Sequence, residues 1–341
     1  MAYTTINKST DNFNTKLYTG NSSTNAITGI GHQPDLVWMK NRGAGDKHYL
    51  FDAVRGVTKS IYSNLTSAEA TTSNGLTAFG TDGFTLGNEG DINGNGNNFV
   101  SWNWKAGAGA GSANTDGSIN TTSTSVNTTA GFSISKYTGN GSNPSTVGHG
   151  LGVAPKMIII KNLDQGTDWQ VYHASTGNTK GLLLNSTAAA FTSSFWGDTT
   201  PTNSVFTLGV GDVNTNNINY IAYCFAEKTG YSKIGSYTGN GSTDGPFVYT
   251  GFKPAWVMIK RTDDVHDWRM HDSVRNPSNV IGKYVEANTT DVEGDSVTLD
   301  FISNGFKLKT TTGAHNASGG TYIYLAFAEE PLVGDNPATA R

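Results

Sequence analysis

Short apolar runs alternate along the chain with polar segments that are rich in Gly, Asn, Thr and Ser. No stretch keeps apolar residues at the helical spacing i, i+3, i+4, i+7 over three turns, so no long helix is predicted. Glycine, of which the chain has 42, and asparagine both tolerate the positive φ angles that tight hairpin turns require. The pattern predicts an all-β protein of many short strands joined by tight turns.

Four sequence features recur three times in the same order. They are a Tyr-Thr-Gly-Asn motif, a proline followed by an apolar run that ends in lysine, a Phe-x-Leu motif, and an aromatic-rich closing strand. The motifs begin at Tyr18, Tyr137 and Tyr237, the lysines are Lys40, Lys161 and Lys260, the phenylalanines are Phe84, Phe206 and Phe306, and the closing strands cover 99–104, 220–225 and 322–327. The spacing between corresponding features varies by no more than three residues. The sequence therefore predicts three tandem copies of one module.

Each copy contains two kinds of strand. The run after the proline is continuously apolar, which is typical of a central strand buried on both faces. The closing strand places large apolar side chains on one face, such as Val100, Trp102 and Trp104 in the first copy. Two sheets that pack over such faces form a β-sandwich. We predict three tandem β-sandwich modules of jelly-roll or lectin-like type, with Trp104, Phe225 and Phe327 at equivalent buried positions.

The spacing of the copies divides the chain into five parts. We expect sandwich modules at residues 1–106, 130–228 and 229–333, a linker at 107–129 and an extended tail at 334–341. The linker is rich in Gly, Ser, Thr and Asn and has no apolar periodicity. It is expected to be a flexible or extended connector and the most protease-sensitive stretch. Only Lys228–Gly230 separates the second and third copies, which are therefore expected to pack rigidly.

Composition narrows the class of protein. The chain has 36% hydrophobic and 15% charged residues and a formal net charge of −4, so it carries no electrostatic footprint for nucleic acid or an anionic membrane. No apolar run approaches the ~20 residues that span a bilayer, and the first residues lack the pattern of a signal peptide. The one cysteine, Cys224, lies in an apolar strand and is expected to be buried. We predict no nucleic-acid partner, no membrane insertion, and folding in a reducing compartment.

Trp196 is a candidate for ligand binding. It lies before a loop that the other copies lack, and a solvent-facing tryptophan on such a loop can stack on a sugar. The alternative, which we favour, is that Trp196 takes the core position that Phe79 and Phe301 have in the other copies.

Two Asp-Arg pairs are further candidates. Asp52 and Arg55 have the same spacing as Asp272 and Arg275, while the second copy has His173 in place of the aspartate. Arginine binds planar anions in bidentate fashion, so each pair could clamp a polar ligand. The alternative, again favoured, is a structural ion pair that fixes a turn.

A calcium loop is the one metal-site hypothesis. Asp91, Asn93 and Asn95 place oxygen donors at alternate positions before a glycine. The twelfth position of such a loop would be glutamate, but here it is Trp102, and runs of this kind between strands are usually turns. We predict no cofactor, with calcium as the alternative.

No catalytic or zinc-binding motif occurs, so we predict a non-enzymatic protein without catalytic residues, although dispersed carboxylates leave a glycosidase-like pair open.

Several strings resemble a module found in virion proteins of tailed phages, notably marine ones. The strings lie at 230–242 and 245–256, at 51–56, 82–87 and 102–107, and at the opening 2–6 and the ending 326–334. The resemblance covers nearly the whole chain. Proteins of this family are commonly labelled tail-fibre-like, and the resemblance implies a virion structural protein with no catalytic residue to carry over.

The chain differs from a typical fibre, because it begins directly with a module and has no coiled-coil heptads or collagen-like triplets. We expect a tail-fibre or receptor-binding component of the virion, assembled in the host cytoplasm, that contacts other virion proteins and a host surface glycan or receptor. The alternatives are a capsid decoration protein and, from a different class, a carbohydrate-cleaving depolymerase. We also expect a homotrimer in which linker residues contact another subunit.

Overall fold

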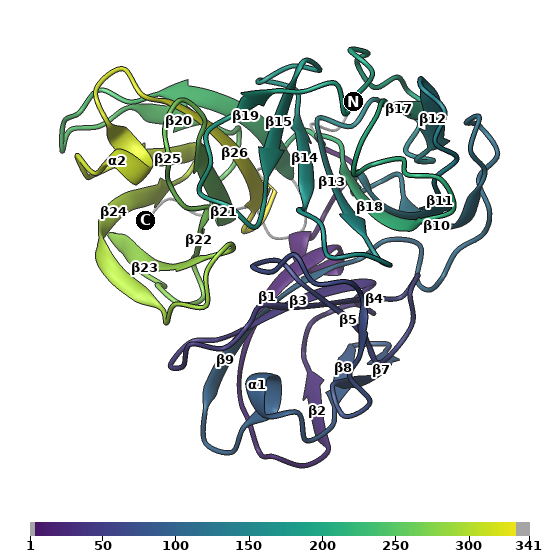
Figure 1. Ribbon diagram of the computed structural model, residues 1–341. Helices are drawn as coiled ribbons and strands as arrows, with labels where there is room; N and C mark the ends of the chain where they lie inside the picture. Colours follow the sequence, from purple (N-terminus) through teal and green to yellow (C-terminus); the bar gives the residue numbers. More distant parts are fainter. Residues whose placement is uncertain (1–3, 332–341) are drawn as a thin grey trace.

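Three repeats form three lobes around a common centre. The computed structural model describes residues 4–331, so the predicted tail at 334–341 lies outside the described residues. Within this range the chain is all-β, as predicted, and its paired strands are antiparallel. In Figure 1 the first repeat is the purple to blue lobe, the second is teal, and the third is green to yellow.

The first repeat consists of a large and a small sheet. Its elements are η1 (Ser9–Asp11), β1 (Phe13–Thr19), β2 (Asn25–Thr28), β3 (Leu36–Asn41), β4 (Tyr49–Asp52), β5 (Lys59–Tyr62), β6 (Ala70–Thr71), β7 (Leu76–Gly80), β8 (Gly83–Leu86), α1 (Gly90–Asn93) and β9 (Asn98–Trp104). The large sheet has the strand order β1-β9-β3-β4-β5-β6, and the small sheet has the order β2-β8-β7.

The second repeat has the same plan with one additional outer strand. Its elements are β10 (Thr121–Asn127), β11 (Phe132–Thr138), β12 (Ser145–Gly148), β13 (Met157–Asn162), β14 (Gln170–His173), β15 (Lys180–Leu183), β16 (Phe191–Thr192), β17 (Val205–Leu208) and β18 (Asn219–Phe225). The large sheet has the order β10-β11-β18-β13-β14-β15-β16, and β12 pairs with β17 in the small one.

The third repeat joins both sheets into one nearly closed barrel. Its elements are β19 (Ser232–Thr238), β20 (Phe247–Tyr249), β21 (Pro254–Arg261), β22 (Arg269–Asp272), β23 (Ile281–Glu286), β24 (Gly294–Ile302), β25 (Gly305–Leu308), α2 (Gly313–Asn316) and β26 (Thr321–Ala328). The order is β19-β26-β21-β22-β23-β24-β25-β20. The central strands of the first two repeats, β3 and β13, are buried along their whole length, as the continuous apolar runs predicted.

The Tyr-Thr-Gly-Asn motif ties the start of each large sheet to the loop before its closing strand. In the first repeat, Tyr18 stacks on Phe99 with ring centroids 5.1 Å apart, and its hydroxyl donates to the carbonyl oxygen of Ile92 at 2.8 Å. Gly20 packs so closely that a Cβ there would overlap the carbonyl oxygen of Gly94. The corresponding hydroxyls, of Tyr137 and Tyr237, donate to the carbonyl oxygens of Val213 and His315. The motif recurs because it is part of the fold.

The apolar faces of the three closing strands meet at the centre of the molecule. Trp104, Phe225 and Phe327 are 2%, 4% and 2% exposed. Their ring centroids lie 6.0 to 6.4 Å from one another, and all three pairs have an edge-to-face geometry that aromatic rings favour. The prediction of equivalent buried positions is confirmed. The three rings form a triangle around a pseudo-threefold axis.

The location of this apolar face corrects one part of the sequence prediction. We expected the face to line the interior of each sandwich, and this was wrong. In the second repeat the opposite face of β18, with Ala222 and Cys224, packs over the small sheet, whereas Tyr223 and Phe225 join a core that contains residues of all three repeats. Both faces of the strand are apolar, so its sequence pattern does not indicate which face covers the small sheet.

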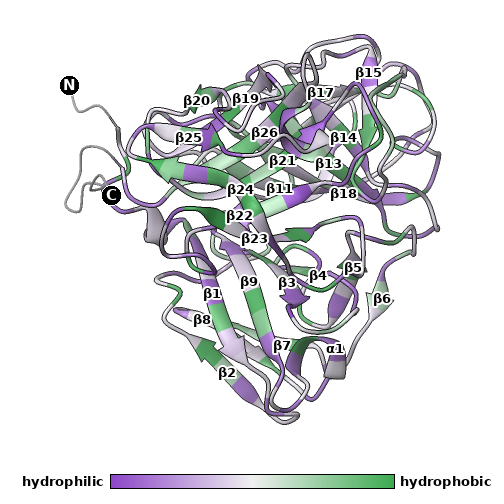
Figure 2. Ribbon diagram, turned by 90° about the vertical axis from the view of Figure 1, so that its left-hand side faces the viewer, coloured by the Kyte–Doolittle hydropathy of each residue, from purple (hydrophilic) through white to green (hydrophobic). Residues whose placement is uncertain are grey.

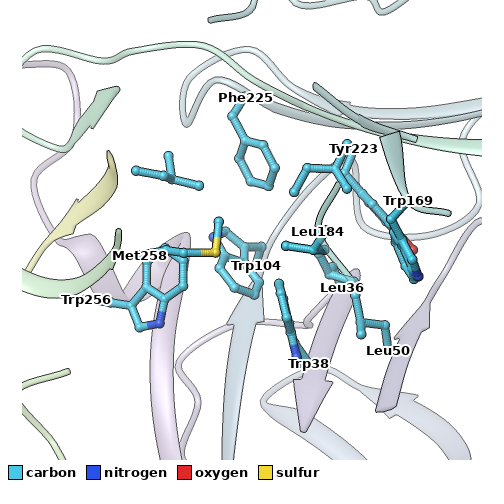
Figure 3. A pocket seen from close by; sticks show the side chains of 12 residues that line it. Leu36, Trp38, Leu50, Trp104, Trp169, Leu184, Tyr223, Phe225, Trp256 and Met258 are labelled. Atoms are coloured by element: carbon cyan, nitrogen blue, oxygen red, sulfur yellow. The ribbon is translucent and has the colours of Figure 1, made fainter. Parts of the chain in front are cut away.

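The shared core is closely packed. Figure 3 shows side chains from all three repeats pointing toward one another, among them Leu36, Tyr223 and Trp256. In Figure 2 the hydrophobic stretches of β26, β21 and β18 lie in the middle of the molecule, between the lobes. The space that remains at the centre measures only about 10 Å³, and apolar side chains enclose it. A space of that size is at the lower limit for one water molecule, so the centre is not a ligand site.

The segment 107–129 is attached to the rest of the chain. The carboxylate of Asp35 accepts hydrogen bonds from the backbone N–H groups of Ala106, Ala108 and Gly109 at 2.7, 2.9 and 2.7 Å. Residues 121–127, which we expected to belong to a connector, form β10 and pair with β11. The expectation of a flexible or extended connector was therefore wrong for this part, because pairing with a neighbouring strand requires no apolar periodicity.

Trp104→Ala should lower the free energy of unfolding by about 3–5 kcal/mol, the usual range for emptying a buried aromatic site. Because the ring contacts the second and third repeats, all three should still unfold in one transition. Urea unfolding followed by circular dichroism measures both properties. The control Val297→Ala removes an exposed side chain and should change stability by no more than about 0.5 kcal/mol. A separate, weaker transition for the first repeat alone would contradict a shared core.

Asp35→Ala should make the segment 107–120 the first site of proteolytic cleavage, since the change removes the acceptor for three backbone N–H groups. The unaltered chain should resist cleavage there under the same conditions. Limited proteolysis with mass spectrometry of the fragments measures this. Asp116→Ala, an exposed aspartate in the same segment, is the matched control and should behave like the unaltered chain. Rapid cleavage of the unaltered chain in this segment would show that the attachment is weak.

Candidate functional site

The two predicted Asp-Arg pairs lie in the turns that follow β4 and β22. Arg55 Nε donates to Asp52 Oδ2 at 2.5 Å, and the pair Arg275 and Asp272 has the same geometry and distance. Burial by itself would lower the pKa of Arg55, but the neighbouring groups Asp52, Tyr223 and Glu69 together outweigh it and raise that pKa. All four side chains of the two pairs are fully buried. Their burial supports the structural alternative over a ligand clamp.

Both aspartates also bond to a different repeat. The hydroxyl of Tyr223, in the second repeat, donates to Asp52 Oδ2 at 2.7 Å. The indole of Trp102, in the first repeat, donates to Asp272 Oδ2 at 3.1 Å. The aspartate of one repeat thus accepts from the closing strand of the next, and the third repeat connects back to the first.

His173 occupies the corresponding position at the interface of the second and third repeats. Its Nε2 lies 3.4 Å from the carbonyl oxygen of Tyr324. The closing strand carries Leu325 where the other two repeats have tryptophan and tyrosine, so no side-chain donor is present for an aspartate. Burial lowers the pKa of His173 to about 4, and the ring is neutral at pH 7.

Trp196 is part of the core. It is 1% exposed, its ring centroid lies 5.5 Å from that of Tyr172, and its indole donates to the carbonyl oxygen of Lys180 at 3.1 Å. A side chain this deeply buried has no free face for a sugar, so the sugar-stacking hypothesis is wrong and the core alternative is correct.

Asp91 and Asn95, two of the three calcium candidates, have separate surroundings. The carboxylate of Asp91 accepts from the hydroxyl of Tyr49 at 3.1 Å and lies 3.4 Å from Lys47 Nζ. Asn95 is exposed, and its backbone N–H donates to the hydroxyl of Ser22. Within residues 4–331 no group of three or more His, Cys, Asp and Glu side chains could hold a metal ion.

Asn93, the third calcium candidate, holds the Tyr-Thr-Gly-Asn turn. Its Oδ1 accepts from the backbone N–H of Asn21 at 3.1 Å, and its Nδ2 donates to the carbonyl oxygens of Ser23 and Gly87. Asn214 and Asn316 accept from Asn140 and Asn240 in the same way. This hydrogen bond to the turn is present in all three repeats, whether or not an acidic residue precedes the asparagine. We therefore assign the asparagine a structural role.

The lysine that ends each central strand bonds across an interface between repeats, a role that sequence reasoning missed. Lys40 Nζ donates to the carbonyl oxygens of Asn41 and Ala44 in its own repeat and of Thr290 in the third. Lys161 and Lys260 likewise reach the carbonyl oxygens of Thr66 and Thr187 in the preceding repeat, at 3.1 and 2.8 Å. Burial lowers the pKa of all three lysines to about 8. A lysine at the same position of all three repeats was visible in the sequence, and this recurrence could have indicated the structural role.

One backbone contact marks the same position at all three interfaces. The N–H groups of Glu69, Ala190 and Glu293 donate to the carbonyl oxygens of Leu163, Thr262 and Arg42, at 2.8, 2.8 and 2.9 Å. At two of the interfaces the residue at this position is a glutamate that pairs with the arginine described above. Glu69 lies 3.3 Å from Arg55, and Glu293 lies 3.4 Å from Arg275.

At the interface of the second and third repeats this ion pair is missing. Ala190 replaces the glutamate, and Thr176 replaces the arginine. A groove of about 430 Å³ lies here, which we call the 2–3 groove, lined by residues that include Ser175, Thr176, Lys180, Ala190, Ser236 and Thr262. Its volume is within the range of small-molecule sites, so it is the candidate functional site. The groove was not predicted from the sequence, because its lining comes from segments about 60 residues apart. These segments lie side by side only in the folded chain, where each can be compared with the equivalent segment of the other repeats.

Between pH 8 and 9 the three buried lysines should make the protein more stable as the pH rises. The three buried lysines have a pKa of about 8 in the folded chain, below the ordinary value of 10.5. The unfolded chain therefore binds more protons in this window, and the free energy of unfolding rises by up to about 1 kcal/mol per pH unit for each lysine. Below pH 8 both states are protonated, and this dependence is lost.

Urea unfolding at pH 7, 8, 8.5 and 9 measures the slope. Lys161→Met should reduce it, since one of three equivalent groups is removed. Lys8→Met, which changes an exposed lysine, is the control and should leave the slope unchanged. A stability that falls steadily between pH 8 and 9 would contradict the assignment.

Comparison with known proteins identifies a family. The chain matches the domain of unknown function DUF7483 over residues 8–331. Searches of curated proteins and of solved structures found no match. No helix within residues 4–331 is long and apolar enough to cross a bilayer. The matched segment runs from before η1 to after β26 and so covers all three repeats of this chain. The chain belongs to the DUF7483 family.

Proposed function

We propose that this chain is a non-enzymatic structural protein of a tailed-phage virion, and specifically a tail-fibre or receptor-binding component. The observation that carries the proposal is the closed ring of three repeats around the triangle of Trp104, Phe225 and Phe327. The resemblance of the repeats to virion proteins is the second support.

The use of the charged residues supports a structural role. The aspartates of the Asp-Arg pairs, the three lysines at the ends of the central strands, and the backbone N–H groups of Glu69 and Glu293 all bond to a neighbouring repeat. The carboxylates and bases singled out from the sequence therefore have structural partners, which favours a binding protein over a hydrolase.

The pseudo-threefold symmetry suits a partner with threefold symmetry. Three covalently linked copies of one surface can each contact one subunit of a trimeric virion protein, and the linkage gives the second and third contacts a high effective concentration. The partners that we propose are accordingly other virion proteins, with a host glycan or receptor bound on the outward side.

The homotrimer predicted from the sequence remains a proposal, but the structure supports a second form of assembly. The residues that we expected to contact another subunit, 107–129, contact Asp35 and β11 of their own chain. A single chain thus supplies a threefold arrangement by itself. In this form the protein acts as a monomer that caps a threefold axis.

A capsid decoration protein is the second candidate. The same ring favours it, because a three-lobed monomer can also cover a local threefold position between capsid subunits.

Immunogold labelling of purified virions, with mass spectrometry of their proteins, tests the proposal. We expect the chain in the particle and the label at the tail, and label on the head would instead assign it to the capsid. Absence from the particle would overturn both. Sedimentation of the purified chain at micromolar concentration should give a monomer of 36.1 kDa for the capping form, whereas a species of three chains would support the homotrimer. Release of new reducing ends from host surface glycan would make the protein a depolymerase.

A further inference from the structure

One lysine in the 2–3 groove has lost the acidic partner that its counterparts keep. Lys59 lies 3.9 Å from Glu69, and Lys283 lies 4.0 Å from Glu293. Lys180 is the equivalent residue in the second repeat, where alanine replaces the glutamate. Within residues 4–331 no carboxylate oxygen lies within 4.0 Å of its Nζ atom.

The ammonium group of Lys180 nevertheless has the same placement as that of Lys59. Lys59 pairs with Thr71 in the sheet, and Lys180 pairs with Thr192. The Nζ atoms donate to the hydroxyls of these threonines, at 2.9 and 3.1 Å. The cation is therefore held at the wall of the groove, and Ala190 lies two residues before the paired threonine, as Glu69 does in the first repeat.

Smaller residues at three further positions open the space beside this cation. Thr176 replaces arginine. Ser236 on β19 takes the strand position of Lys136 in the second repeat and Leu17 in the first, as their pairing with the closing strands shows. Thr262 takes the position of Leu163 and Arg42, as the shared backbone contact shows.

Apart from Lys180, the lining of the groove is uncharged and rich in hydroxyl groups. Among the described residues that line it, Lys180 is the one with a charged side chain, and the others include six with aliphatic hydroxyls: Ser175, Thr176, Ser236, Thr238, Thr262 and Thr321. The hydroxyls of Ser175 and Ser236 make no hydrogen bond within the described part of the chain. They can donate to or accept from a ligand.

We infer that the 2–3 groove binds an acidic sugar, such as a hexuronic acid, with the carboxylate of the sugar beside Lys180. The ligand carboxylate takes the place that Glu69 and Glu293 fill at the other two interfaces. A carboxylate fits better than a phosphate dianion, because the site offers one ammonium group and no arginine fork. The hydroxyls of the lining match those of a sugar ring. This inference is independent of whether the chain is a virion component.

Saturation-transfer NMR with the full chain and sodium glucuronate tests the inference, with neutral glucose as the comparison ligand. Glucuronate should bind, and glucose should bind at least about tenfold more weakly, because it forms no charge-assisted hydrogen bond with Lys180. Lys180→Met should weaken glucuronate binding by a similar factor. Lys59→Met, which changes the equivalent lysine at the first interface, is the matched control and should leave binding unchanged.

A second variant introduces a carboxylate into the groove from the chain itself. The change Ala190→Glu restores beside Lys180 the carboxylate that Glu69 and Glu293 supply to Lys59 and Lys283 at the other two interfaces, so the chain should keep its thermal unfolding temperature and lose glucuronate binding. Equal binding of glucose and glucuronate, or undiminished binding by Lys180→Met, would overturn the inference. Displacement of glucuronate by inorganic phosphate at a lower concentration than glucuronate itself would replace the carboxylate assignment with a phosphate site.

Discussion

Burial of the second apolar face of each large sheet is the interaction on which the rest of the structure depends. One face of the sheet is covered by the small sheet of the same repeat, and the other has to be covered by the other two repeats. Aromatic rings such as Trp104 each bury roughly 150–250 Å², which corresponds to about 4–6 kcal/mol per ring at 25 cal/mol per Å². We therefore expect a single repeat to be much less stable alone than in the complete ring.

Polar contacts around this core give the ring its direction. The lysines at the ends of the central strands reach back to the preceding repeat, and the aspartates reach forward to the following closing strand. Apolar packing is non-directional, so it does not by itself exclude a shifted or reversed arrangement of the repeats. Buried hydrogen bonds with defined partners do, since a wrong register would leave an ammonium or carboxylate group unpaired.

A binding site is most readily identified at positions where one repeat differs from the other two. The first and third repeats keep aspartate, arginine and glutamate at one interface position each, whereas the second has His173, Thr176 and Ala190. All three differences lie in the same repeat. The result is a hydroxyl-lined groove with a cation at one of three otherwise similar interfaces.

The sequence by itself determined the all-β class, the three repeats, their register and the buried central strands, because these depend on local periodicity and on spacing along the chain. It also allowed the correct alternatives for Trp196 and for the Asp-Arg pairs, since repetition favours a structural role. Only the tertiary structure decided which face of the closing strand covers the small sheet, because both faces are apolar. Only the tertiary structure showed that residues 121–127 pair in a sheet and that Lys180 has lost its carboxylate, because these facts depend on which segments lie side by side.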